Sequence, residues 1–254
     1  MQTQIVRNKT FFEKNLVNLE DVDVVSKQLN EYGLVTFENI KSKDQLISIS
    51  KQLGVVFLHR DSDADGITHV VNKGGLDEKV GFKGLTSAGL NLHTDRSGVT
   101  NPPELLVFYC NTPATQGGET ILADGKEIYN KLKEEYPGVL SLILREYSVV
   151  FGGSDDNVSV SIFKFINTDR LQIRFRYDEL GFYSSSIISI MPLFLEIMES
   201  CCSSFKLEQN QGYIIKNDRW LHGRTTFSGP REMYRILLSL NSEINDNIKK
   251  GFVV

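Results

Sequence analysis

Short segments that alternate apolar and polar residues, or run apolar, fill the middle and the end of the chain and predict β-strands. They are rich in β-branched and aromatic residues and are separated by turn-forming residues. The predicted strands cover residues 34–40, 55–60, 103–110, 119–124, 147–151, 158–163, 171–179, 213–216 and 233–240. Many short strands separated by turns favour a closed or sandwiched antiparallel sheet.

Apolar residues at helical spacing between these strands predict helices around the sheet. A helix over 21–32 ends before Gly33 and another over 43–53 ends before Gly54, because glycine commonly follows the last helical residue. Asp124 is a suitable N-cap for a helix over 125–132. Further helices are predicted over 137–144 and, with an amphipathic pattern, over 192–203. The pattern as a whole predicts a mainly β protein with flanking helices.

The segment 61–92 is polar and glycine-rich and shows little periodicity. A long irregular segment inside a compact domain is more often a functional lid or binding loop than a simple connection. Neither an internal repeat nor a linker divides the chain. We therefore predict one domain over 1–254, with 61–92 as an active-site lid.

Composition and charge narrow the classes of partner. The chain has 28 Lys and Arg against 32 Asp and Glu, a formal net charge of -4, so neither nucleic acid nor a membrane is an expected partner. Its N-terminus lacks the basic start and apolar stretch of a secretory signal, which predicts a cytoplasmic protein. Cys110, Cys201 and Cys202 are expected to be reduced, with the adjacent pair on a helix. A homo-oligomer is compatible with this sequence.

His93 and Asp95 form the first candidate metal-binding pair. Side chains two residues apart in a strand project from the same face, so the imidazole and the carboxylate could bind one cation. A His-x-Asp pattern arises often by chance and is weak evidence alone. His222 lies 222 - 95 = 127 residues after Asp95 and follows a predicted strand and turn. Two histidines and one carboxylate on one face of a metal are the ligand set of non-haem iron(II) oxygenases.

This ligand set leaves two other classes of protein open. A catalytic zinc ion could use the same three ligands to activate water in a hydrolase, whereas a structural zinc site would have four ligands, often cysteines. A non-enzymatic protein that binds a small molecule on the same barrel is the third alternative.

Arg231 and Arg235 favour the oxygenase. They lie four residues apart at the start of a predicted strand and therefore share a face if the strand is regular. A buried guanidinium is costly without an anionic partner, so an inward arginine near the metal implies an anionic ligand. The distal carboxylate of 2-oxoglutarate is such a ligand, and hydrolysis requires none.

The chain contains three further sequence blocks, NLHTDRSG (91–98), QGGETILADG (116–125) and NDRWLHGRTTFSGPREMYR (217–235). Together they resemble the signature blocks of the taurine dioxygenase family, also called the clavaminate synthase-like oxygenases. The resemblance covers about residues 30–250 and implies a double-stranded β-helix (jelly-roll, cupin-like) core that binds Fe(II), 2-oxoglutarate and dioxygen. It also implies that Thr120 and Arg231 hold the distal carboxylate of 2-oxoglutarate and that Arg235 faces an acidic group of the substrate, although these two arginine roles could be exchanged.

Within that family the chain looks closest to a compact subgroup that acts on free amino acids. In the halogenases of this subgroup a glycine replaces the metal-binding carboxylate, whereas Asp95 is present here. The resemblance therefore implies hydroxylation, or less often desaturation, of an unactivated C–H bond in a small polar molecule such as an amino acid.

Other residues near the motifs carry weaker expectations. Arg96 and Trp220 are substrate-contact candidates, although strand alternation should turn Arg96 away from Asp95 and Trp220 is more typical of packing. Arg224 is a candidate for substrate contact or for a structural role. His59 and His69 are expected to be buried and hydrogen-bonded rather than to contact substrate.

Overall fold

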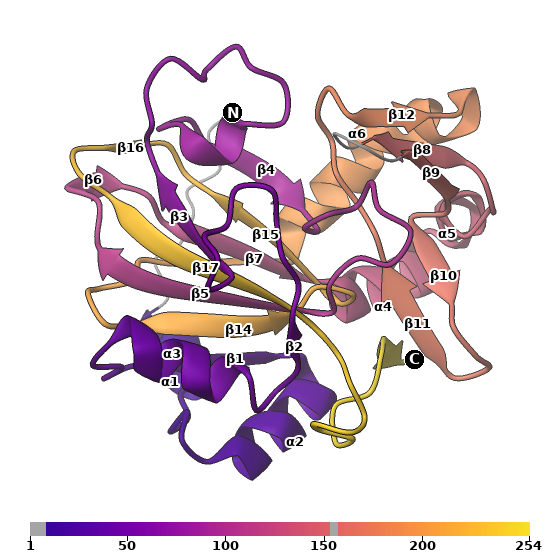
Figure 1. The fold of residues 1–254 in the computed structure, drawn as a ribbon. Coiled ribbons are helices and arrows are strands. Elements are labelled where there is room, and N and C mark those ends of the chain that lie inside the picture. The colour runs from indigo at the N-terminus through magenta and orange to yellow at the C-terminus, as the bar shows by residue number, and fades with distance from the viewer. Residues whose placement is uncertain (1–8, 153–156) are drawn as a thin grey trace.

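The computed structural model describes residues 9–152 and 157–254, and two β-sheets that face each other form its centre (Figure 1). The strands of the larger sheet are β1 (Leu34–Phe37), β2 (Val55–Val56), β3 (Ile67–Val71), β5 (Leu105–Thr112), β14 (Gly212–Lys216) and β17 (Glu232–Ser239). The strands of the smaller sheet are β4 (Leu90–His93), β7 (Thr120–Asp124), β13 (Cys202–Phe205) and β15 (Trp220–Arg224).

Segments distant in sequence lie side by side in both sheets. The larger sheet has the order β1-β14-β5-β17-β2, with β3 also paired to β17, and the smaller has the order β13-β7-β15-β4. All of these pairs are antiparallel. The peripheral strands are β6 (Gln116–Gly117), β8 (Val149–Gly152), β9 (Asn157–Val160), β10 (Phe163–Phe165), β11 (Arg170–Ile173), β12 (Gly181–Tyr183), β16 (Phe227–Ser228) and β18 (Phe252–Val253).

Period-two alternation within the strands divides the core into three layers. In β5, Leu106 and Phe108 join the cluster between the two sheets, whereas Leu105 and Val107 join the cluster on the outer face of the larger sheet. In the smaller sheet, Leu122 points inward, and Ala123 and Leu221 belong to the outer cluster. Each sheet therefore buries both faces.

Helices cover the two outer faces. α2 and α3 pack on the larger sheet, and α4, α5 and α6 lie beyond the smaller one (Figure 1). Asp21 caps α2 by accepting a hydrogen bond from the Val24 amide, and Gly33 ends it in the left-handed conformation at φ 72°. The helices are α1 (Lys9–Lys14), α2 (Val22–Tyr32), α3 (Lys43–Ser50), α4 (Gly125–Glu135), α5 (Pro137–Ile143), α6 (Ser185–Ser200) and the 3-10 helix η1 (Lys83–Leu85). None of the described helices is long and apolar enough to cross a membrane.

The structure corrects several boundaries predicted from the sequence. The predicted lid 61–92 contains β3, which completes the larger sheet, so its irregular part lies between β3 and β4. α6 begins at Ser185 instead of 192, because the buried stripe that includes Ile187 and Met191 continues upstream of Pro192, which lies inside the helix. Cys201 caps this helix and Cys202 begins β13, so the two cysteines do not lie on a helix as expected.

Candidate metal centre

Strand pairing places two histidines beside each other between the sheets. β15 and β4 run antiparallel with His222 directly opposite His93, and the ring centroids are 4.3 Å apart. His222 is buried, and His93 is partly exposed. Nδ1 of His93 donates a hydrogen bond to the Asn91 carbonyl at 2.8 Å, which leaves the Nε2 lone pair available in the neutral ring.

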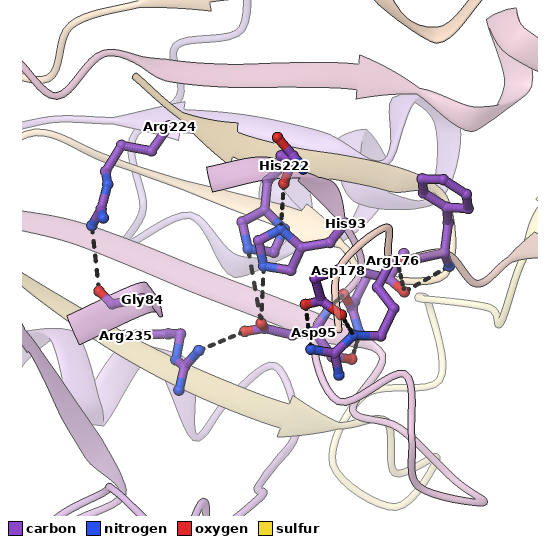
Figure 2. Close-up of polar contacts among 12 residues, drawn as sticks. Gly84, His93, Asp95, Arg176, Asp178, His222, Arg224 and Arg235 are labelled. Carbon is purple, nitrogen blue, oxygen red and sulfur yellow. Dashed lines mark hydrogen bonds and ion pairs between the residues drawn. The ribbon is translucent and has the colours of Figure 1, made fainter. Parts of the chain in front are cut away.

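Asp95 completes a group of three potential metal ligands (Figure 2). Its Oδ1 is 3.7 Å from Nε2 of His93 and 3.9 Å from Nε2 of His222. One ligand atom from each residue lies within 4.8 Å of the other two, which is compact enough for one ion. The His-x-Asp pair and the distant His222 therefore converge, as the sequence suggested.

Burial and charge give these groups the protonation states that metal binding requires. Burial, with a smaller contribution from His93, lowers the pKa of His222 to about 3, so this ring is neutral near pH 7. Burial would raise the pKa of the Asp95 carboxyl, but Arg235 and the two histidines hold it well below its usual range. Nη1 of Arg235 lies 3.0 Å from Oδ2 of Asp95, whereas the histidines face the other oxygen, Oδ1 (Figure 2). A neutral imidazole and an anionic carboxylate fit a divalent cation.

The three residues line a cavity of about 200 Å³. Every other site residue predicted from the sequence except Trp220 also lines it, namely Thr120, Arg231, Arg235 and Arg96. The indole of Trp220 donates to the Tyr32 carbonyl at 2.9 Å and packs against Phe11. Trp220 lies two residues before His222 on β15 and projects from the same face of the strand. At its position, packed apolar residues fill the space between the sheets. Trp220 therefore makes packing contacts, the role that the sequence favoured, and its contact with substrate stays a prediction.

Thr120 and Arg231 lie together in a buried part of the cavity. The Thr120 hydroxyl hydrogen-bonds to Tyr213, and the Arg231 guanidinium lies 5.2 Å from the centroid of Phe227. Nη1 of Arg231 is buried and has no hydrogen-bond partner among the described residues. A Cβ on Gly118, whose φ is +70°, would lie 3.2 Å from Nε of Arg231, so the glycine turn before Thr120 makes room for this arginine.

Arg96 reaches the cavity although strand alternation predicted otherwise. Its φ is 56°, in the left-handed region, so the chain leaves the extended conformation directly after Asp95. The side chain of Arg96 therefore does not follow the alternation of β4, and the residue lines the same cavity as Asp95.

Arg176, Asp178 and His59 are among the cavity-lining residues that the sequence did not indicate as site residues. Arg176 and Asp178 form an ion pair, with Nε 2.7 Å from Oδ1 (Figure 2). Their Arg-x-Asp spacing resembles that of His93 and Asp95 and could have indicated a pair on one face. His59 also lines the cavity, and its Nδ1 accepts a hydrogen bond from the Asp61 amide at 3.1 Å.

Two arginines hold the irregular segment between β3 and β4 over the cavity. Arg224 donates to the carbonyls of Gly84, Thr86 and Ala88 at 3.3, 2.8 and 2.6 Å. Arg60 lies 4.3 Å from the centroid of Phe82 and donates to the Gly81 carbonyl. Arg224 therefore makes structural contacts here. His69 lies outside the cavity lining and bonds to Glu232 at 2.8 Å.

Comparison with known proteins decides the family. Residues 8–237 match the model of the family described as "Taurine catabolism dioxygenase TauD, TfdA family". The chain belongs to the TauD/TfdA family. The match confirms the resemblance in the three sequence blocks, and all three lie within it.

The relatives of this TauD/TfdA protein are distant. Human gamma-butyrobetaine dioxygenase is 25% identical over 241 residues, which cover 79% of this chain and 61% of the relative. The chain thus spans about three fifths of that relative's length. Among solved structures, an asparagine oxygenase with Fe(II), hydroxyasparagine and succinate matches with a TM-score of 0.73 and 11% identity, covering 93% of this chain and 85% of the other. The oxygenase OrfP, with iron, succinate and 3-hydroxyarginine, matches with a TM-score of 0.68 and 10% identity, covering 92% of this chain and 86% of the other.

Proposed function

We propose that this protein is an Fe(II)- and 2-oxoglutarate-dependent dioxygenase that hydroxylates an unactivated C–H bond of a small polar substrate, an amino acid or a derivative. The observation that carries the proposal is the convergence of His93, Asp95 and His222 in one cavity with a buried arginine, Arg231, that has no carboxylate partner among the described residues. The two facing antiparallel sheets support a double-stranded β-helix, or jelly-roll, as the finer description of the fold.

The donor set fits iron(II). His93, Asp95 and His222 would occupy one face of the ion and leave the other positions open. With dioxygen and 2-oxoglutarate, bound iron supplies oxidative decarboxylation coupled to oxidation of a C–H bond. Asp95 stands where the related halogenases have glycine, which supports hydroxylation. A zinc hydrolase would not need Arg231, whose buried Nη1 has no hydrogen-bond partner among the described residues, and the family is one of dioxygenases.

Thr120 and Arg231 are the proposed anchors for the distal carboxylate of 2-oxoglutarate. A buried guanidinium without a carboxylate partner is unfavourable, and an anionic ligand would pair with two of its N–H groups. Arg235 already pairs with Oδ2 of Asp95, which favours Arg231 over Arg235 for this role. Arg235 would then orient Asp95 and face the acidic group of the substrate.

The remaining wall suits a zwitterionic substrate. Arg96 supplies a cation next to Asp95, and Asp178 supplies a carboxylate held by Arg176. We propose that Arg96 contacts the substrate directly. The asparagine oxygenase and OrfP, which hold hydroxylated amino acids in their structures, support an amino acid as the substrate class.

Succinate release measured with iron(II), 2-oxoglutarate and a panel of amino acids tests the function. The expected result is succinate formation that one or more amino acids stimulate and that a metal chelator abolishes. Calorimetric titration of 2-oxoglutarate into the anaerobic ferrous protein is the parallel test. Absence of 2-oxoglutarate binding would refute the oxygenase, whereas binding without stimulation by any member of the panel would refute only the amino-acid substrate.

We further propose that the segment between β3 and β4 is a lid and that Arg224 holds it. Substituting Arg224 with leucine removes hydrogen bonds to three carbonyls, and hydrogen bonds to a charged group each contribute about 1.5–3 kcal/mol. We expect trypsin to cut after Lys79 and Lys83 at least about tenfold faster in Arg224→Leu than in the unmodified protein, because a loss of about 1.4 kcal/mol already gives that factor.

Arg170 offers a matched control for the lid experiment. It also donates to three carbonyls, those of Lys249, Lys250 and Gly251, but it lies outside the cavity lining. Arg170→Leu should loosen the C-terminal segment and leave cleavage after Lys79 and Lys83 unchanged. Equal cleavage there in both variants would show that Arg224 does not hold the lid specifically.

A further inference from the structure

Asn217 lies in the turn between β14 and β15, five residues before His222, and none of its side-chain atoms belongs to the proposed metal site. It is 2% exposed, and its side-chain amide makes three hydrogen bonds. Oδ1 accepts a hydrogen bond from the Asp95 amide at 2.7 Å, and Nδ2 donates to the carbonyls of Asp95 at 2.9 Å and Pro103 at 2.8 Å. A reversed amide would place donor against donor, so these contacts fix its orientation.

The backbone of Asp95 needs such a partner because it lies beyond the strand ladder. The pairing of β4 with β15 ends at His93 opposite His222, and β4 itself ends at His93. Arg96, the next residue, has a φ of 56°, so the chain turns sharply after Asp95 into a conformation that residues other than glycine adopt reluctantly. Asn217 supplies the two backbone hydrogen bonds that a neighbouring strand would otherwise provide.

The residue before Asp95, Thr94, is held by a different segment of the chain. The Thr94 amide donates to the Phe175 carbonyl at 2.7 Å, and the Thr94 hydroxyl accepts from the Phe175 amide at 3.1 Å. These contacts restrain Thr94. The backbone N–H and carbonyl of Asp95 are bonded instead by the side chain of Asn217. The direction in which the Asp95 carboxylate leaves the backbone therefore depends on Asn217.

We propose that Asn217 is a positioning residue that aims the Asp95 carboxylate at the two histidines. Its turn leads directly into β15, so one side chain connects the segment that carries His222 to the segment that carries Asp95. This inference rests on the proposed metal site. A residue that orients a metal ligand in this way is expected to influence metal affinity about 10- to 100-fold.

Metal binding by Asn217 variants tests the proposal, with Mn(II) as a probe that does not oxidise under the conditions of calorimetry. Asn217→Ala removes all three hydrogen bonds. Asn217→Asp keeps the shape and an acceptor for the Asp95 amide, but its carboxylate cannot donate to the two carbonyls. Both variants are expected to bind Mn(II) about 10- to 100-fold more weakly than the unmodified protein. Asn217→Ser is the milder replacement if Asn217→Ala does not fold.

Asn245 provides the matched control. It is also a buried asparagine, and its Nδ2 donates to Ser26 at 2.7 Å, but it lies outside the cavity lining. Asn245→Ala should lower the melting temperature of the metal-free protein without weakening Mn(II) binding. The ligand-field absorption of bound Co(II), which reports coordination geometry, should change in the Asn217 variants and not in Asn245→Ala.

Three outcomes separate the alternatives. Unchanged Mn(II) affinity and an unchanged Co(II) spectrum in the Asn217 variants would overturn the positioning role while leaving the metal site intact. An equal loss of Mn(II) affinity in Asn245→Ala would mean that general destabilisation explains the loss, and it would also overturn the positioning role. Failure of the unmodified protein to bind Mn(II) would remove the metal site itself and, with it, this inference.

Discussion

Replacing His222 with alanine is expected to abolish 2-oxoglutarate turnover, with a fall in succinate formation of more than about a thousandfold. Loss of one ligand removes several kcal/mol of stabilisation that the metal provides, and each 1.36 kcal/mol corresponds to a factor of ten. His222 is 5% exposed and its ring is neutral, so it can offer a nitrogen ligand to the metal, and alanine cannot. Succinate formation and metal content, measured on the same preparation, check the prediction.

His69 is the control for this substitution. It lies on β3, bonds to Glu232 at 2.8 Å and is 3.4 Å from Asp63, and it does not line the cavity. His69→Ala should retain metal and most of the activity. A His222→Ala protein that keeps full metal content and turnover would mean that a different group of residues binds the metal.

The sequence was sufficient to predict the parts of the fold and site that depend on local patterns and on residue type. Short apolar runs rich in β-branched and aromatic residues predicted β5 and β7, and Asp124 and Gly33 marked helix ends where the structure has them. His93, Asp95 and His222 were selected because only certain side chains bind iron, and strand register places the two histidines opposite each other beside Asp95. Chemistry of this kind depends on residue identity, which the sequence shows directly.

Other features depend on contacts between distant segments, and the sequence did not reveal them. β3 lies in a glycine-rich stretch, and its strand conformation depends on pairing with β17. The cavity-facing position of Arg96 follows from a left-handed φ that no alternation rule includes. Asn217 was noted only as the start of a sequence block, because its bonds to Asp95 span 122 residues. The stacking of Arg60 on Phe82 likewise depends on the folded segment between β3 and β4.

The roles of Arg231 and Arg235 could not be separated by sequence, but their surroundings differ. Arg235 pairs with Asp95 at 3.0 Å, whereas Arg231 is 9% exposed and has a buried Nη1 without a hydrogen-bond partner among the described residues. Burial lowers the pKa of Arg231, but an arginine remains charged near pH 7. An anionic ligand is therefore expected to gain more from Arg231 than from Arg235.

Arg231→Leu is consequently expected to raise the dissociation constant of 2-oxoglutarate at least about thirtyfold. Truncating one partner of a buried, hydrogen-bonded charge pair costs about 2–5 kcal/mol, and 2 kcal/mol corresponds to about that factor. Arg231→Lys keeps the charge but loses the bidentate geometry, so its affinity for 2-oxoglutarate should lie between those of the unmodified protein and Arg231→Leu. Calorimetric titration of 2-oxoglutarate into the anaerobic metal-loaded protein measures both effects.

The matched variant Arg235→Leu distinguishes the two assignments. It removes the partner of Oδ2 of Asp95, so it should weaken metal binding and substrate-stimulated turnover more than the affinity for 2-oxoglutarate in protein saturated with metal. If Arg235→Leu instead loses 2-oxoglutarate binding while Arg231→Leu retains it, the two roles are exchanged. Because both arginines line the same cavity, that result would keep the oxygenase assignment and move the distal carboxylate of 2-oxoglutarate from Arg231 to Arg235.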